Sequence, residues 1–495
     1  MLLRDNGQTV SIEQSTTKVA PQITKVARSG DYQIDALLVG SSWDSPSTIT
    51  YSFLTSAAAG SYYGTETVSK LTKAAIGNIR TLVETLIEPL INVNFVEVAD
   101  SASSYGQIRY MFSNGPSYAY THYPLSSTDP ISGDVHLSPN FETDSDNKLS
   151  GKPGIHGYTT LIHETLHALG LKHPDHYDGK GTGTQSVLPY GEDNLSNTVM
   201  TSNFGGAAPA TLMPYDIKAL QYIYGAKAYN GENTTYSFSS VYGYTANDQS
   251  WGSSTTPMKL AIWDSGGKDT LDFSALSFNT SGYRFDLREG ETNTTKSAYN
   301  DTSYTASGDT SGTTYLTSSN GTAIAYNTVI ENAIGTSSKD TIAGNAANNT
   351  LNGGAGNDTL IGGLGTDILV GGTGNDSLTG SAGRDRLTGG TGADRFVFKS
   401  KTEGRDTIAD FSVIDDTINV SKAGFGDGLS AGVTIAAAQF RLGARAGDTS
   451  DRFIYNKITG GLFFDVDGTG ATEQLQFAQL SANLAMTNND IFVIA

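Results

Sequence analysis

The chain has 495 residues, a formal net charge of −19 at pH 7 and no cysteine. This length exceeds what one hydrophobic core usually organises, so we expect two or more domains. The acidic charge argues against a nucleic-acid-binding protein, because such a surface cannot neutralise a row of phosphates. The lack of cysteine excludes a disulfide scaffold, thiolate zinc ligands and a cysteine nucleophile.

The first residues, 1–33, are polar and show no clear periodicity, so we interpret them as a leader or short pro-segment. They lack the apolar core of a cleaved signal peptide. The sequence contains no run of eighteen apolar residues, so we expect no membrane span.

Residues 34–226 have the pattern of a mixed domain of helices and strands. Residues 48–54 alternate between apolar and polar, as a strand does, and residues 67–90 carry apolar side chains at helical spacing. Two further strand-like runs begin at Asn94 and Gln107.

Beyond residue 226 the chain consists of short β runs separated by Gly, Asn, Asp and Ser, and a nine-residue repeat follows. Its units are GTSSKDTIA, GNAANNTLN, GGAGNDTLI, GGLGTDILV, GGTGNDSLT, GSAGRDRLT and GGTGADRFV, beginning at Gly335. The sixth residues of the units are Asp340, Asn349, Asp358, Asp367, Asp376, Asp385 and Asp394. The eighth residues are all large and apolar and are expected to stack inward as a thin core.

Each repeat unit combines a glycine-rich turn with a carboxylate, and both supply the hard oxygen ligands that Ca²⁺ prefers. Glycines permit positive φ and bring turn carbonyls together. We therefore predict several structural Ca²⁺ ions bound by the six aspartates and by the turns of Gly353, Gly354, Gly356, Gly362, Gly363, Gly365, Gly371, Gly372 and Gly374. Without cations the stacked carboxylates repel one another and the coil is expected to be disordered. A flexible low-complexity linker is the alternative, but linkers do not keep Asp and Leu in register.

The segment YTTLIHETLHALGLKHP contains the residues that point to an enzyme. His163 and His167 are one helical turn apart and face the same side, so both imidazoles can reach one ion. Glu164 is placed beside that ion, Gly170 is suited to leave the helix in a left-handed conformation, and His173 follows as a third ligand. Three neutral nitrogens and a water describe an open, catalytic zinc site.

The extended motif H-E-x-x-H-x-x-G-x-x-H resembles that of the metzincin zinc proteases, and together with the repeats it resembles the serralysin family of calcium-dependent proteases. The resemblance implies an α+β metzincin-like catalytic domain followed by an all-β parallel β-roll or β-sandwich that binds calcium. It implies that Met200 lies beneath the zinc in the Met-turn. The family usually has a tyrosine zinc ligand two residues later, where this chain has Ser202. The expected divisions are 1–33 leader, 34–226 zinc metalloprotease domain, 227–334 β-rich lead-in, 335–400 RTX (repeats-in-toxin) β-roll and 401–495 C-terminal β region with an export signal.

The activity implied is that of a secreted, extracellular zinc endopeptidase with one catalytic zinc. In it a zinc-activated water attacks the peptide bond and Glu164 acts as general base. The expected partners are protein or peptide substrates, a type I exporter that reads the C-terminal residues 490–495 and a periplasmic proteinaceous inhibitor, and we expect a monomer. The substrate would add to an edge strand, for which residues 117–124 are the candidate.

Further calcium ligands are expected at both ends of the roll, with solvated turn aspartates as the alternative for each. The residues concerned are Asp264, Asp269, Asp272, Asp406 and Asp410.

Two other functions stay open from the sequence. One is a catalytically impaired RTX calcium-binding surface or adhesion protein, favoured only by Ser202 and opposed by the intact His and Glu set. The other is a different zinc hydrolase carried on an RTX tail.

Overall fold

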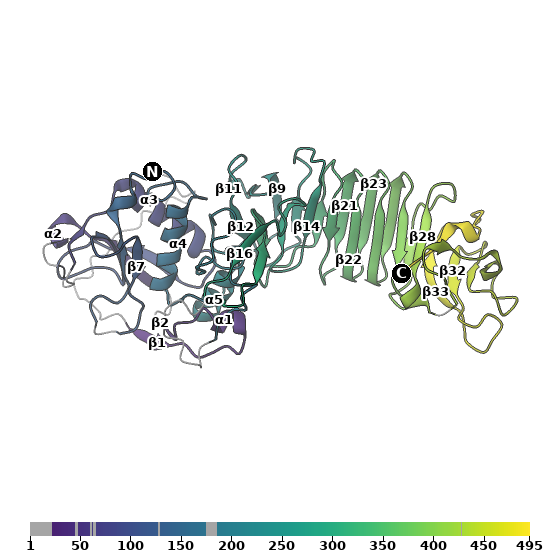
Figure 1. Cartoon of the computed structure of the whole chain (residues 1–495), viewed down its shortest axis with the longest axis horizontal. Coiled ribbons are helices and arrows are strands. Elements are labelled where there is room, and N and C mark those ends of the chain that lie inside the picture. Colours follow the sequence, from purple (N-terminus) through teal and green to yellow (C-terminus); the bar gives the residue numbers. More distant parts are fainter. Residues whose placement is uncertain are drawn as a thin grey trace.

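The computed structural model describes residues 22–44, 48–59, 62, 66–126, 129–174, 186–426 and 428–495. Residues 1–21 of the predicted leader lie outside the described residues. The N-terminal part combines helices and strands, and the C-terminal part consists mostly of strands that continue along the long axis (Figure 1). These two classes of structure are in the predicted order.

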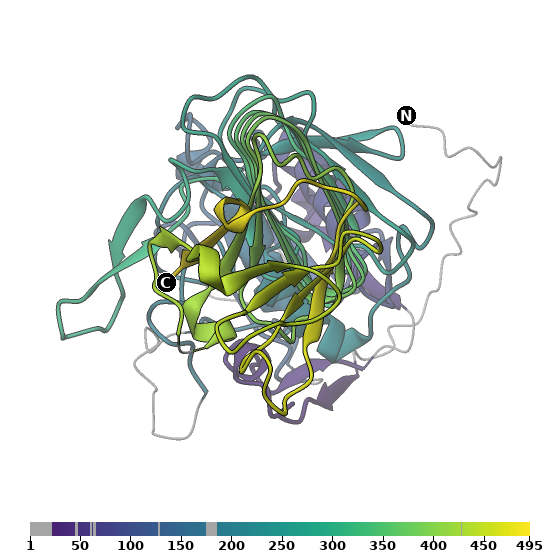
Figure 2. The ribbon, with the colours of Figure 1, turned by 90° about the vertical axis from the view of Figure 1, so that its right-hand side faces the viewer.

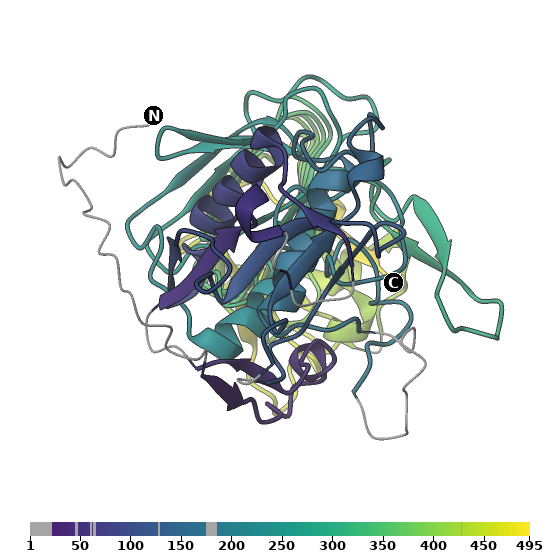
Figure 3. The same ribbon diagram turned by 90° about the vertical axis from the view of Figure 1, so that its left-hand side faces the viewer.

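The N-terminal part is built on a six-stranded sheet with strand order β5-β3-β6-β8-β7 and with β4 paired to β6. The first four strands of that order are parallel, and β7 is antiparallel to β8 at the sheet edge. Figure 3 shows this part in front, with the strands of the C-terminal part behind it. The strands are β3 (Thr48–Phe53), β4 (Val68–Ser69), β5 (Asn94–Glu97), β6 (Ile108–Ser113), β7 (Ala119–Thr121) and β8 (Asp134–Leu137).

The longer helices of this part pack against its core. The helix expected over residues 67–90 is shorter, because the Thr72 hydroxyl accepts a hydrogen bond from the Ala75 N–H and caps its start. The zinc-motif helix α4 has 11 of its 13 residues buried. The helices are α1 (Tyr32–Asp35), α2 (Ser56–Ala59), α3 (Lys73–Thr81) with its π-helical continuation η1 (Leu82–Ile87), the 3₁₀ turn η2 (Pro139–Phe141), α4 (His156–Ala168) and α5 (Pro214–Tyr224).

Residues 22–33, assigned to the leader from the sequence, pack against the following domain. Strand β1 (Ile23–Lys25) pairs antiparallel with β2 (Ser41–Trp43). Asp31 forms an ion pair of 2.6 Å with Lys218 of α5. The structure therefore continues across residue 33 without a break.

The repeats form parallel strands that alternate between two large sheets, so one turn of the coil takes two repeats. Strands β21, β23 and β25 lie in a 13-stranded sheet, whereas β20, β22, β24 and β26 lie in an 11-stranded sheet. Leu351, Leu369 and Leu387 occupy one register row, and all three are fully buried. Figure 2 shows the green coils of the repeats one behind another. The predicted thin core of eighth-position side chains is confirmed.

The C-terminal part contains twenty-six strands, one short helix and two 3₁₀ turns within the described residues, and no other helix is described there. The lead-in and repeat strands are β9 (Thr235–Ser240), β10 (Gly243–Ala246), β11 (Gln249–Gly252), β12 (Lys259–Ile262), β13 (Thr270–Asp272), β14 (Tyr283–Asp286), β15 (Thr292–Thr295), β16 (Thr302–Thr305), β17 (Thr314–Thr317), β18 (Gly321–Ile324), β19 (Asn332–Ile334), β20 (Thr341–Ala343), β21 (Thr350–Ala355), β22 (Thr359–Gly365), β23 (Ile368–Thr373), β24 (Ser377–Gly383), β25 (Arg386–Thr391) and β26 (Arg395–Phe398). The remaining elements are β27 (Asp406–Ile408), β28 (Thr417–Ser421), α6 (Lys422–Phe425), β29 (Val433–Thr434), η3 (Ala437–Gln439), β30 (Phe440–Leu442), β31 (Phe453–Tyr455), β32 (Gly461–Phe464), β33 (Leu475–Gln479), η4 (Asn488–Asp490) and β34 (Ile491–Ile494).

Two leucines of β22 provide a test of the thin core. Leu360 is fully buried and Leu364 is 59% exposed. We predict that Leu360→Ala lowers the free energy of unfolding of the C-terminal part by about 2–5 kcal/mol, because it leaves a cavity. Leu364→Ala is expected to change it by less than about 0.5 kcal/mol. Denaturant unfolding in saturating Ca²⁺ measures both, and equal losses would contradict the inward stacking.

Candidate metal centres

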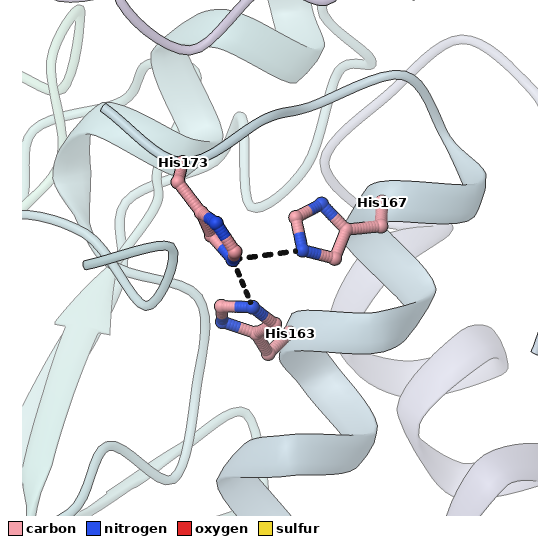
Figure 4. Close-up of side chains that lie close together, drawn as sticks. All are labelled: His163, His167 and His173. Atoms are coloured by element: carbon pink, nitrogen blue, oxygen red, sulfur yellow. Dashed lines mark hydrogen bonds between the residues drawn. The ribbon is translucent and has the colours of Figure 1, made fainter. Parts of the chain in front are cut away.

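Three histidines converge at the C-terminal end of α4. The helix ends at Ala168. Gly170, just beyond it, adopts a positive φ of 99°, and the reversed chain brings His173 back toward the helix. The Nε2 atom of His173 lies 3.0 Å from that of His163 and 3.1 Å from that of His167 (Figure 4). Within the described stretches of chain, this is the one group of three or more His, Cys, Asp or Glu residues whose ligand atoms lie close enough for a metal ion.

The surroundings fix the protonation of two of these rings. The Nδ1 of His163 donates to the Val199 carbonyl at 2.8 Å, and the Nδ1 of His167 donates to the Leu171 carbonyl at 2.8 Å. Burial lowers the pKa of His163 to about 3 and that of His167 well below its ordinary value. Both rings are therefore neutral, with the Nε2 lone pairs directed at a common point, which is the donor set that Zn²⁺ takes in proteins.

Glu164 follows His163 in α4, and its carboxylate is held by the edge strand. The Thr121 hydroxyl of β7 donates to Glu164 Oε2 at 2.6 Å. Burial raises the pKa of Glu164 to about 7, and the bond from Thr121 lowers it. A carboxyl group with a pKa near neutrality can take up and release a proton under physiological conditions.

Met200 is fully buried in the core of the N-terminal part. The turn before it is held by Asp216 of α5, which accepts hydrogen bonds from the Thr198 hydroxyl at 2.5 Å and the Val199 N–H at 2.9 Å. Because the Val199 carbonyl in turn binds His163, Asp216 positions a histidine that it does not touch. Asp216 was not predicted from the sequence, although its place in the first turn of a helix after a proline is a typical capping signal.

One tyrosine ring contacts the histidines from the segment that follows β7. The ring of Tyr123, within the predicted edge segment, meets the ring of His167 edge to face at 5.2 Å. Tyr215 instead donates to Glu192 at 2.7 Å. No signal in the motif pointed to Tyr123.

The aspartates of the repeats form two ladders along the coil. In all of them except Asp340, Oδ1 accepts the backbone N–H of the residue eighteen positions earlier, as Asp376 does from Asp358 at 2.8 Å. The second oxygen is buried and has no hydrogen-bond partner in five of them, namely Asp358, Asp367, Asp376, Asp385 and Asp394. Burial raises the pKa of Asp358 to about 7 and those of Asp367 and Asp394 to about 6. A row of buried, unpaired carboxylate oxygens fits Ca²⁺ ions between the turns.

Asp340 and Asn349 complete the ladders on their N-terminal side. Asp340 Oδ2 accepts the Thr336 N–H at 2.7 Å. Asn349 uses its amide to donate to the Ile330 carbonyl at 3.3 Å and the Glu331 carbonyl at 3.2 Å. At this sixth position of the repeat, the Asn349 amide nitrogen is therefore hydrogen-bonded, whereas five of the aspartates present an unpaired oxygen there.

The turn glycines are required where successive coils approach closely. Gly354 and Gly372 have φ of 95° and 112°, and a Cβ on Gly372 would collide with the Gly354 carbonyl oxygen of the preceding coil. The other predicted turn glycines with positive φ are Gly356, Gly363, Gly365 and Gly374, whereas Gly353, Gly362 and Gly371 each lie against an aspartate carboxylate.

The aspartates predicted as calcium ligands at the two ends of the roll differ in their contacts. Asp406 and Asp410 extend the ladders, since they accept the N–H groups of Asp385 and Gly389, both at 3.0 Å. At the lead-in, Asp269 has a buried Oδ2 without a hydrogen-bond partner. Asp272 accepts the Ser274 N–H at 3.0 Å, which is a turn contact.

The chain was compared with known proteins and structures. The model of the RTX calcium-binding nonapeptide repeat (4 copies) matches residues 334–369 and 361–396. Metalloprotease AprA of Pseudomonas entomophila (strain L48) is 30% identical over 332 residues, which cover 62% of this chain and 61% of that protein. Serralysin G of Dickeya chrysanthemi is 36% identical over 202 residues (38% of this chain and 36% of that protein), and serralysin of Proteus mirabilis is 33% identical over 205 residues (39% and 36%).

The matches thus span between about a third and three fifths of these relatives' own length. Among solved structures, myroilysin matches with a TM-score of 0.23 at 17% identity over 37% of this chain and 95% of that chain. The AlgE6R3 subunit of the Azotobacter vinelandii mannuronan C5-epimerase matches with a TM-score of 0.20 at 27% identity over 32% and 80%.

No helix in the described segments has the length and apolar character needed to cross a membrane. The nonapeptide repeats and the similarity to the serralysins and to AprA support a serralysin-family protein with an RTX domain.

Proposed function

We propose that the protein is a secreted, extracellular zinc endopeptidase that hydrolyses peptide bonds of proteins or peptides. The observation that carries this proposal is the convergence of the Nε2 atoms of His163, His167 and His173. The similarity to serralysins points to the same class of enzyme.

In the proposed reaction the three histidines hold one Zn²⁺, which when bound supplies Lewis acidity toward a peptide carbonyl and toward water. Glu164 removes a proton from the attacking water and later passes it to the leaving amine. Thr121 holds the carboxylate in place by its bond to Oε2.

The substrate would bind in extended form along β7. This strand pairs with β8 on one side and stands at the end of the sheet order. The carbonyls of Tyr118 and His122 accept N–H groups from the β8 side. By the alternation of an antiparallel ladder, the backbone groups of Ala119 and Thr121 face the other way and can bind a peptide.

We propose that Ca²⁺ ions occupy the aspartate ladders and complete a parallel β-roll, and that the N-terminal part is a metzincin-like catalytic domain. The domain divisions given from the sequence are retained in this proposal, with residues 22–33 packed on the catalytic part. The proposed export segment contains β34, which pairs in parallel with β28. Recognition by a type I exporter, inhibition by a periplasmic protein and a monomeric state belong to the same proposal.

An impaired calcium-binding surface or adhesion protein is the second candidate, favoured by Ser202. Gelatin zymography with a chelator selective for zinc over calcium separates the two. We predict that the chelator abolishes clearing and that added Zn²⁺ restores it. A protein that binds calcium but clears no gelatin at any zinc concentration would support the adhesion function.

Glu164 provides a test of the general base. We predict that Glu164→Gln lowers kcat/KM by about 10²–10⁴-fold and leaves the zinc content unchanged, since the carboxylate moves protons but is not a ligand. Casein hydrolysis and metal analysis on the same sample measure both. Glu97→Gln, a change on the exposed ion pair with Arg80, is the control, and near-normal cleavage by Glu164→Gln would rule out the role.

Asp367 provides a test of the calcium ladder. The effect of its substitution on stability is expected to have opposite signs with and without Ca²⁺. Burial raises the pKa of Asp367 to about 6, so its charged form destabilises the calcium-free fold at neutral pH. We predict that Asp367→Asn stabilises the calcium-free protein, or leaves it unchanged, and destabilises the calcium-loaded protein.

The calcium-free wild type is further expected to gain stability as the pH falls from about 7 toward 4, because the raised pKa makes the folded state bind more protons than the unfolded state. Thermal unfolding with and without Ca²⁺, across this pH range, measures both effects. Destabilisation by Asp367→Asn in both conditions would contradict the ladder.

A further inference from the structure

An aromatic row lies at the N-terminal end of α4, away from the three converging histidines. The ring of His156, the first residue of the helix, stacks on the ring of Tyr118 with centroids 5.3 Å apart and planes inclined by 10°. The ring of Phe204 meets His156 edge to face at 5.3 Å. We call Tyr118, His156 and Phe204 the aromatic platform.

Phe204 is exposed although its backbone is fixed. Its side chain is 65% exposed. On one side, the Asn203 side-chain oxygen accepts the Ser307 N–H at 2.7 Å. On the other, the Gly205 carbonyl accepts a hydrogen bond of 2.6 Å from the buried Lys259 ammonium group. Phe204 therefore presents a large apolar ring to solvent next to the His156 ring.

The platform lies in line with the three histidines. His156 and His163 are seven residues apart, which is about two helical turns, so they share one face of α4. Their Cα atoms are about 10.5 Å apart along the helix axis, at a rise of about 1.5 Å per residue. An extended peptide advances about 3.3 Å per residue, so a substrate would cover this distance in about three residues.

The strand β7 gives the direction of that substrate. Tyr118, which precedes the strand, stacks on His156, so the strand begins near the platform. Thr121, its last residue, donates to Glu164, so the strand ends near the general base. Antiparallel pairing is the more stable ladder. A peptide antiparallel to β7 places its C-terminal residues, those after the scissile bond, beside the platform.

We propose that the aromatic platform selects an aromatic or large apolar side chain at the third residue after the scissile bond. This inference rests on the proposed peptidase function and adds a specificity determinant to it. The exposed Phe204 ring, backed by His156 and Tyr118, offers the offset and edge-to-face contacts that aromatic side chains prefer. Apolar contacts of this size discriminate between substrates by about 10–200-fold in kcat/KM.

The test uses the full-length, zinc- and calcium-loaded protein and fluorogenic peptides with one cleavable bond. The peptides differ only in carrying Phe or Ser at the second, third or fourth residue after that bond, and mass spectrometry of the products verifies the bond cut. The measured quantity is the ratio of kcat/KM for the Phe peptide to that for the Ser peptide. For the wild type we expect a ratio of about 10 or more at the third position and a ratio near 1 at the other two.

Two variants make the test specific. Phe204→Ala is expected to lower the ratio at the third position to about 1. Phe278→Ala removes the same side chain from a site that is 68% exposed in the C-terminal part, and it is expected to keep the wild-type ratio. Because each ratio is taken within one variant, a general loss of activity does not mimic the result.

A wild-type ratio near 1 at the third position, or a preference that survives in Phe204→Ala, would overturn the platform while leaving the peptidase intact. Hydrolysis of no peptide or protein by the zinc-loaded wild type would instead overturn the proposed function itself. The two failures are therefore distinguishable.

Discussion

The approach of His173 to the two helical histidines depends on one tight turn. Gly170 adopts a positive φ, and a Cβ there would meet the Ser41 carbonyl oxygen of the N-terminal segment. That segment also binds the turn, since the Val39 N–H donates to the Gly170 carbonyl at 3.0 Å. The bend is thus specified by glycine and held by residues far away in sequence, and without it α4 would present only two of the three nitrogens.

The C-terminal part depends on a different interaction, because ionisable aspartate side chains are buried next to its apolar core. The eighth-position side chains form a core only one residue thick, while the unpaired oxygens of the aspartate ladder lie buried beside it. Burying an unpaired carboxylate costs free energy unless it is protonated or coordinated. The raised pKa values of Asp358 and Asp394 reflect that cost. A cation at each turn would change the sign of this contribution, and the fold of the coil would then be conditional on the proposed calcium ions.

Local patterns in the sequence were sufficient to predict helices and strands, but not how these elements pack against one another. The histidine spacing predicted α4 and its metal-facing side, and the nonapeptide period predicted the strands and their buried rows. The role of Asp216, the packing of Ile23–Lys25 on Ser41–Trp43 and the exposed position of Phe204 arise from contacts between segments far apart in sequence. No periodicity records such contacts, because each depends on where two independently patterned segments meet.

The two parts also share the loop that carries Met200 and Phe204. Lys259, which binds Gly205, belongs to β12, and β12 lies in the same 11-stranded sheet as the repeat strands β20, β22, β24 and β26. The hairpin of β16 and β17 binds the same loop, as in the 2.7 Å contact between Thr317 and Ser196. Loss of order in the coil would therefore reach the loop through the sheet. In the proposed enzyme, calcium would then support catalysis by holding the wall of the substrate site, without a calcium ion near the reacting bond.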